Sequence, residues 1–262
     1  MRTVKLVLAY DGTDFNGWQR QKFSEEAAAE QGKASQSRRR TVQECIEAAL
    51  ARMHEHPVAL TGAGRTDSGV HAAGQVAGFR TDIKSIEPGR FVPALNAILP
   101  RDIRILEACE AIPDFHARFD AKTRSYRYHF VCGRQALPHE NRYALQLWRR
   151  PRIDLLNAYC RLLLGERDCS VFAAAGDLAQ SRSRYISHAV FLAEGNSLVF
   201  EITANAFLWK MVRSVAGTFL HYEERNTPPE VLREVIASSD RGLAGPTLPP
   251  QGLFLWKVAY YR

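Results

Sequence analysis

The sequence predicts an α+β protein with two related lobes, each an antiparallel sheet with helices on one side. Three observations support this class. Strand-like alternation of apolar residues begins near the N-terminus, helical spacing of apolar residues follows it, and both patterns return after Pro113. The 262 residues are 46% hydrophobic, which is sufficient for one large or two ordinary domains. We place the lobes at 1–110 and 111–262.

The first lobe is predicted in the order strand, helix, strand, strand, helix, strand. Large apolar residues at positions 4, 6, 8 and 10 alternate with their neighbours, which indicates a strand that ends at Asp11-Gly12. Thr41 and Glu44 have capping-box spacing, and apolar residues then recur at helical spacing until Pro57. The remaining elements are two strands that bracket 62–72, a helix at 88–99 and a strand at 103–106.

This order is the ferredoxin-like split βαβ arrangement, in which both helices cover one face of a four-stranded sheet. The second half follows a similar but embellished order. Its predicted elements are strands at 124–131, 185–192, 198–204 and 253–260, and helices at 153–164, 208–222 and 229–237. We therefore expect two lobes whose sheets are joined side by side, with an active-site cleft between them.

The segment 22–40 has a different composition. It is rich in Ala, Glu, Gln, Ser and Arg, and Phe23 is its only large apolar residue, so it buries too little surface to hold a fold. We predict a mobile insertion between the first strand and the first helix. Its end, Arg38-Arg39-Arg40, is interpreted either as a phosphate contact or as a solvated linker.

Charge and cysteine content limit the possible functions. The chain has 35 Lys and Arg against 28 Asp and Glu, a net charge of +7 that favours a polyanionic partner such as nucleic acid, although basic enzymes with other substrates are common. The five cysteines are widely spaced, predicting buried free thiols in a reducing compartment. No zinc-binding spacing and no apolar stretch of ~20 residues occur, so we expect no metal, no membrane association and a cytoplasmic location.

The run at 62–72, Gly-Ala-Gly-Arg-Thr-Asp-Ser-Gly-Val-His-Ala, contains the main catalytic candidate. Gly62, Gly64 and Gly69 let the backbone adopt positive φ angles or let another chain approach closely, and Asp67 lies among them. The run lacks the dinucleotide and Walker patterns, which argues against a nucleotide-cofactor loop. The alternative for Asp67 is a tight hairpin in which its carboxylate accepts local N–H groups.

Polar or aromatic residues also interrupt plain strand and helix patterns elsewhere. Arg213 lies within an apolar helix, where a buried guanidinium is costly unless a carboxylate meets it; the alternative is a solvated helix face. Lys122, Arg124, Tyr126 and Tyr128 share one strand face, and the alternative for Tyr126 is an ordinary core position.

Seven short motifs occur in a fixed order along the chain. They are Tyr-Asp-Gly at 10–12, Gly-Trp-Gln at 17–19, Thr-Val-Gln at 41–43, Gly-Arg-Thr-Asp with Gly-Val-His at 64–71, Phe-His-Ala-Arg at 115–118, Arg-x-Tyr-x-Tyr at 124–128 and Phe-Leu-x-x-Met-Val-Arg at 207–213. Each motif alone is weakly specific, but the ordered set closely resembles the tRNA pseudouridine synthase A (TruA) family over nearly the whole chain.

The resemblance implies a cofactor-free isomerase that converts uridine to pseudouridine at positions about 38 to 40 of the tRNA anticodon stem-loop, acting as a homodimer. It implies that Asp67 is the nucleophile, that Arg213 pairs with it, and that Tyr126 lies against the target base. Whether Asp67 attacks the sugar or the uracil ring stays open. Alternatives are a synthase for another structured RNA and a non-catalytic RNA-binding module.

The resemblance also implies an RNA-binding surface. A uridine in a stem must be flipped out before it can react, and Arg65 matches the family residue that assists flipping. The candidates for contacts with phosphates are Arg20, Lys122, Arg124, Arg182 and Lys210.

Overall fold

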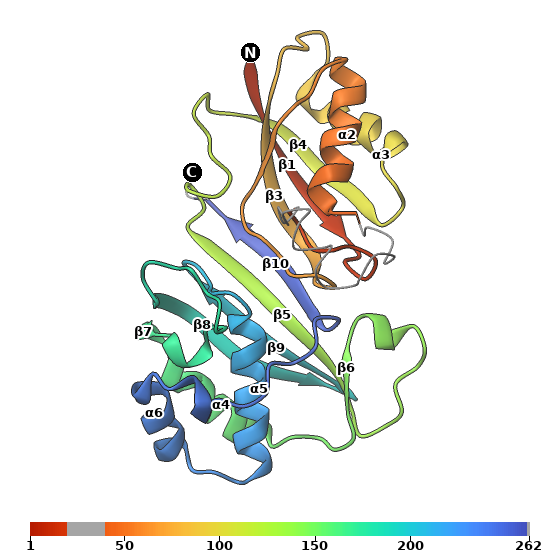
Figure 1. Cartoon of the computed structure of the whole chain (residues 1–262). Helices are drawn as coiled ribbons and strands as arrows, with labels where there is room; N and C mark the ends of the chain where they lie inside the picture. Colours follow the sequence, from red (N-terminus) through yellow and green to blue (C-terminus); the bar gives the residue numbers. More distant parts are fainter. Residues whose placement is uncertain (20–39, 261–262) are drawn as a thin grey trace, which may run out of the picture. The chain divides into compact units, whose positions relative to one another are not determined.

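A computed structural model of the chain describes residues 1–19 and 40–260 (Figure 1). The chain divides into two compact units, Met1–Asp120 and Ala121–Arg262. Both contain helices and a mostly antiparallel sheet, which confirms the predicted α+β class. The predictions for Arg20, Arg38 and Arg39, and for most of the segment 22–40, lie outside the described residues.

The first unit contains four strands in the spatial order β4-β1-β3-β2, and every neighbouring pair is antiparallel. The predicted succession of strand, helix, strand, strand, helix and strand is confirmed. Its elements are β1 (Arg2–Tyr10), α2 (Val42–His54), β2 (Leu60–Gly62), β3 (His71–Thr81), α3 (Phe91–Ile98) and β4 (Ile103–Ala111).

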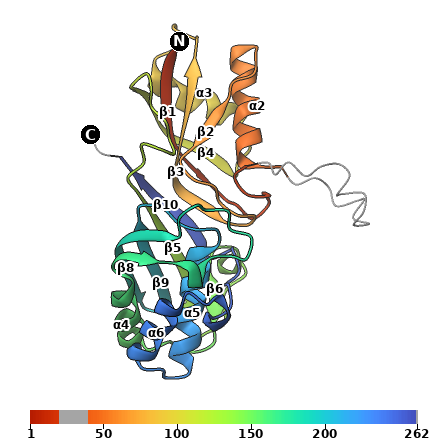
Figure 2. The same ribbon diagram turned by 60° about the vertical axis from the view of Figure 1, so that its left-hand side comes forward.

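Alternation along β1 decides which face of the first sheet is covered. Val4, Leu6 and Leu8 are fully buried, as are Leu50 of α2 and Leu95 of α3, so both helices contribute to one core. Figures 1 and 2 show α2 and α3 beside the strands of this unit.

The predicted capping box starts α2. The Thr41 hydroxyl accepts the Glu44 N–H at 3.3 Å, and the Glu44 carboxylate accepts the Thr41 N–H at 3.0 Å. Just before the helix, Arg40 pairs with Asp102 and lies 4.3 Å from the Phe15 ring centroid, so its charge already has a carboxylate partner.

The second unit contains the strand order β10-β5-β9-β8-β7, again antiparallel throughout, and β6 pairs with β5 in parallel. Its helices gather together in Figure 2 and pack on buried aromatic side chains of the strands such as Phe191 and Phe200. Its elements are β5 (Thr123–Cys132), β6 (Leu145–Leu147), α4 (Ile153–Leu163), β7 (Gly165–Asp168), β8 (Ser183–Glu194), β9 (Ser197–Ala204), α5 (Met211–Glu224), α6 (Pro229–Ser238) and β10 (Leu253–Ala259).

Several details differ from the sequence prediction. Helix α5 begins at Met211 rather than at 208, because Lys210 has a left-handed backbone with φ of 59°. The short strands β6 and β7 were not predicted, and β4 continues beyond 106. Cys109 is exposed on β4, so the prediction of buried thiols is wrong there. Across 1–19 and 40–260, no helix has the length and apolar character needed to cross a membrane.

Candidate functional site

Asp67 lies in the connection between β2 and β3 and is half-buried. Its main-chain carbonyl accepts the Val70 N–H at 3.1 Å, and Gly69 has φ of 78°, which closes a tight turn directly after the acid. The main-chain carbonyl of Asp67 is therefore held within the turn, and the strands β2 and β3 anchor the loop at its two ends.

Residues 10–18 form a clamp around this loop. The Tyr10 hydroxyl lies 2.8 Å from the Thr66 hydroxyl, and both residues are buried. The Trp18 N–H donates to the Thr66 carbonyl at 3.1 Å, and the Ser68 hydroxyl donates to the Phe15 carbonyl at 3.1 Å. The residues on both sides of Asp67 are thus hydrogen-bonded to one distant segment, which fixes the path of the loop.

Glycines make this close approach possible. Gly17 has φ of +83°, and a Cβ there would lie 2.5 Å from the Thr66 oxygen and 3.1 Å from the Asp67 carbonyl carbon. A Cβ on Gly12 would lie 2.0 Å from the Val70 oxygen. The Tyr-Asp-Gly and Gly-Trp-Gln motifs therefore have a physical role that the sequence alone did not reveal, which is to hold the Asp67 loop.

The loop glycines differ in their roles. Gly69 has the positive φ that the sequence predicts, and a Cβ on Gly62 would lie 2.5 Å from the Trp18 indole. Gly64 is absent from the positive-φ glycines of the described chain, and a Cβ there would meet none of its atoms within 4 Å, so only the approach of another chain stays as a prediction for it.

His71 anchors the far end of the loop. It is fully buried, and its Nδ1 lies 3.0 Å from the Gly12 nitrogen and 3.2 Å from Asp11 Oδ1. The same Asp11 oxygen accepts the Thr13 N–H at 3.0 Å. This imidazole therefore links the end of β1 to the start of β3.

Tyr126 lies on β5, in the second unit. It is 8% exposed, pairs in register with Ile202 and Leu255, and its ring lies 5.0 Å from that of Phe207 in an edge-on arrangement. The strand alternation that places Tyr126 and Tyr128 on one face is confirmed by their shared burial.

Arg213 lies in the first turn of α5 and is half-buried. Its Nε donates to the Leu248 carbonyl at 2.6 Å, and its own carbonyl accepts the Leu248 N–H at 3.3 Å. The Arg213 side chain is therefore neither fully buried nor fully solvated. Nearby, burial raises the pKa of Tyr128, and the positive charge of Arg213 acts in the opposite direction.

The candidate RNA-binding residues are distributed over both units. Arg65 is exposed beside Asp67, and Lys122 and Arg182 are exposed in the second unit. Arg124 is half-buried and donates to the Ala121 and Asn205 carbonyls at 2.9 and 2.8 Å. Lys210 is half-buried, with its Nζ 4.4 Å from the Trp209 ring centroid.

The predicted catalytic residues belong to different units. Asp67 lies in the first, and Tyr126 and Arg213 lie in the second. Their meeting therefore stays a prediction. Among residues 1–19 and 40–260, no group of three or more His, Cys, Asp or Glu side chains is arranged to hold a metal ion.

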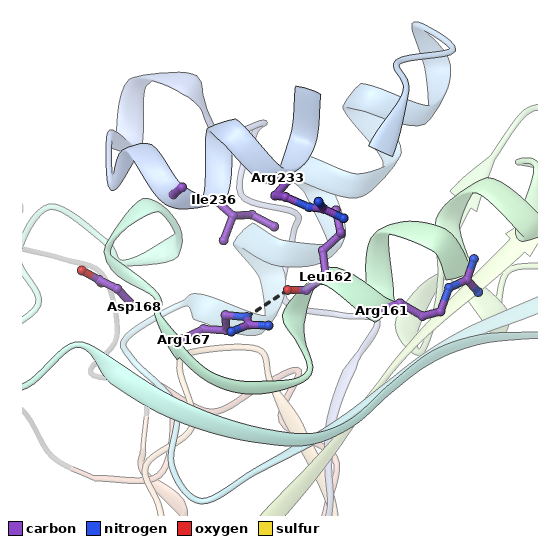
Figure 3. A pocket seen from close by; sticks show the side chains of 7 residues that line it. Arg161, Leu162, Arg167, Asp168, Arg233 and Ile236 are labelled. Carbon is purple, nitrogen blue, oxygen red and sulfur yellow. Dashed lines mark hydrogen bonds between the residues drawn. The ribbon is translucent and has the colours of Figure 1, made fainter. Parts of the chain in front are cut away.

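A cavity of about 450 Å³ lies in the second unit and contains none of the predicted site residues (Figure 3). Arg161 extends away from the other labelled side chains in Figure 3, and the Arg167 Nε donates to the Leu162 carbonyl at 3.1 Å. All the charged side chains that line this cavity are exposed, and exposed charges are typical of a solvated surface. The lining residues are Arg161, Leu162, Arg167, Asp168, Arg233, Ile236 and Ala237.

Comparison with known proteins identifies the family. The model described as tRNA pseudouridine synthase matches residues 7–120 and 159–261. The tRNA pseudouridine synthase A of Treponema denticola is 48% identical over 259 residues, which is 99% of this chain and 93% of its own length. That of an Exiguobacterium species (strain ATCC BAA-1283 / AT1b) is 36% identical over 262 residues, 100% of this chain and 99% of its own length. The chain therefore belongs to the tRNA pseudouridine synthases, a family of isomerases.

Proposed function

We propose that this protein converts uridine to pseudouridine at positions about 38 to 40 of the tRNA anticodon stem-loop, with Asp67 as nucleophile and no cofactor. The observation that carries the proposal is the clamped loop, because hydrogen bonds between residues 10–18 and the neighbours of Asp67 fix the loop that carries this half-buried acid. Relatives named tRNA pseudouridine synthase A support the choice of tRNA as substrate.

The reaction needs no outside reactant. The N-glycosidic bond of uridine breaks, the uracil turns, and a carbon–carbon bond to the same sugar replaces it, with one proton lost from the ring carbon and one gained by the ring nitrogen. Asp67 must be ionised to act as a nucleophile, and a paired Arg213 guanidinium would favour the ionised form and fix its direction. Tyr126 would lie against the base. Attack on the sugar and attack on the ring both remain open.

The proposed architecture places the target uridine between the two lobes. Two ferredoxin-like lobes, with sheets joined side by side, would leave a cleft for a flipped uridine between Asp67 and Arg213. Arg65 would assist flipping, and the RNA backbone would follow Lys122, Arg124, Arg182, Lys210 and Arg20. We further propose a cytoplasmic homodimer.

The decisive test is Asp67→Asn, which keeps the size of the side chain and removes its negative charge. Pseudouridine formation in an anticodon stem-loop RNA should fall by a factor on the order of 10³ or more, since a nucleophile has no substitute. RNA binding should persist, because the lost carboxylate repels phosphate. Asp114→Asn, an exposed acid of the same unit, serves as the matched control and should retain wild-type turnover. Near wild-type turnover of Asp67→Asn would reject the assignment.

The position in tRNA needs a separate experiment. Pseudouridine sequencing of total RNA from a strain lacking this gene should show losses at tRNA positions about 38 to 40. Losses confined to another structured RNA would favour the alternative substrate. Wild-type protein that binds tRNA but forms no pseudouridine would favour the non-catalytic binding module.

A further inference from the structure

We propose that Tyr10 is a positioning residue for Asp67, acting through Thr66. This inference rests on the proposed role of Asp67 as nucleophile. Tyr10 is the last residue of β1, far from residue 67 in the sequence, and its hydroxyl reaches the residue directly before the acid. No feature of a β-strand end requires a phenol at this place.

The contact is buried and specific. The Tyr10 and Thr66 oxygens lie 2.8 Å apart, and the residues are 4% and 8% exposed. Each hydroxyl can donate and accept, so each oxygen can serve as a hydrogen-bond partner of the other. Removing either hydroxyl removes this contact.

Thr66 transmits the constraint to the acid. Its side chain is fixed by Tyr10, and its carbonyl accepts the Trp18 N–H at 3.1 Å. The Asp67 carbonyl is held in turn by the Val70 N–H at 3.1 Å. The Thr66 side chain and the main chain on both sides of the Asp67 Cα are therefore restrained, which fixes the point from which the carboxylate projects.

A nucleophile needs such restraint. A displacement of ~1 Å in a reacting group costs on the order of 10²-fold in rate, even when the substrate still binds. A carboxylate on a short loop has two side-chain torsions of its own, so rigid support of the loop backbone improves its placement. Loss of the Tyr10 contact should therefore lower kcat and leave KM nearly unchanged.

The test is a double-mutant cycle of Tyr10→Phe and Thr66→Val in the full-length protein. Each variant keeps the shape of its side chain and removes one hydroxyl. We expect each single substitution to lower kcat about 10- to 100-fold with less than about threefold change in KM for tRNA. The double variant should be no worse than either single variant, because both remove the same contact. Thr66→Ser, which retains the hydroxyl, should restore most of the rate.

Tyr159→Phe is the matched control for loss of a buried phenol. Its hydroxyl donates to the Thr227 carbonyl in the second unit, and the residue is fully buried. We expect a loss of stability comparable to that of Tyr10→Phe without a change in kcat. An unchanged kcat in folded Tyr10→Phe, independent effects that multiply in the double variant, or an equal fall of kcat in Tyr159→Phe would each overturn the proposal.

Failure of this inference is distinguishable from failure of the proposed function. If Asp67→Asn abolishes turnover and Tyr10→Phe does not lower it, Asp67 keeps its role and Tyr10 is structural only. If Asp67→Asn retains turnover, the nucleophile assignment fails, and positioning of Asp67 by Tyr10 fails with it.

Discussion

Gly17 lies where the clamp closely approaches the residues beside Asp67, and we expect it to tolerate no side chain. Gly17→Ala would force an L-residue to a φ of +83° and place its Cβ 2.5 Å from the Thr66 oxygen. Strain and overlap together should lower the free energy of unfolding by at least about 2 kcal/mol. Thermal unfolding without RNA measures this, with Gly64→Ala as the control, because a Cβ there meets no atom of the described chain within 4 Å. Equal unfolding midpoints of the two variants would contradict the clamp.

Arg213 has a geometric requirement that lysine cannot meet. Its Nε donates to the Leu248 carbonyl at 2.6 Å, and the terminal nitrogens of a guanidinium can hold a carboxylate, such as that of the proposed partner Asp67, in the same plane. Lysine has a single ammonium group and cannot form both contacts in the same planar geometry. We expect Arg213→Lys to fold but to lower kcat about 10- to 100-fold. Arg225→Lys, on an exposed residue just after the same helix, should retain wild-type kcat, and unaltered kinetics of Arg213→Lys would remove the ion pair from the mechanism.

At the scale of elements, Glu223 holds the C-terminal end of α5. Its side chain is fully buried, and its carboxylate accepts the Arg149 Nη1 at 3.1 Å and the Arg152 N–H at 3.0 Å. Burial alone would raise the pKa of Glu223, but the hydrogen bonds from Arg149 and Arg152 and the charge of Arg149 outweigh it, so the pKa is lowered. The ionised carboxylate therefore stabilises the folded state at neutral pH.

Glu223→Gln should lower the free energy of unfolding at pH 7 by about 3 kcal/mol, because the buried negative charge that pairs with two arginines is lost. The sign of the pH dependence follows from the lowered pKa. The contribution of Glu223 is present above the ordinary carboxyl pKa of the unfolded chain and is lost as the pH falls through the lower folded value. Denaturant unfolding at pH 7 and in acid measures the free energy of unfolding and its dependence on pH. The difference in this free energy between wild type and variant should shrink in acid. A constant difference would contradict this role.

Most elements could be predicted because their apolar spacing is local. The capping box at Thr41 and the alternation of β1 each required only neighbouring residues. The start of α5 could not be predicted, since Leu208 continues the apolar pattern while the left-handed backbone of Lys210 breaks the helix. The short strand β7 forms by pairing with β8, and four residues are too few to show a recognisable alternation of apolar and polar side chains.

The candidate site was predicted from the sequence only in part. The glycines and the acid at 62–72 indicated a special loop, and the ordered motifs indicated the family, which the comparisons confirm. The clamp could not be predicted, because the contact of Tyr10 with Thr66 joins residues that are 56 positions apart. Such a contact depends on how β1 pairs with β3, and residue spacing alone does not give that register.

For the whole molecule, the net charge of +7 predicts that tRNA binding depends strongly on salt. Arg65→Gln and Lys122→Gln should each reduce the slope of log Kd against log salt concentration by about 0.7 to 0.9, the value of one lost phosphate contact. Arg90→Gln, an exposed arginine outside the proposed binding set, is the control for a general loss of charge. Binding titrations at four or more salt concentrations measure the slopes, and equal reductions in all three variants would exclude specific contacts.

The distribution of the five thiols has a practical consequence for measurements on this enzyme. Burial raises the pKa of Cys45, Cys132 and Cys160, and that of Cys169 to about 12, which suppresses their thiolates. Cys109 is exposed on β4. A maleimide dye at neutral pH should therefore attach there first, so the natural protein offers a built-in fluorescent reporter without any engineered cysteine.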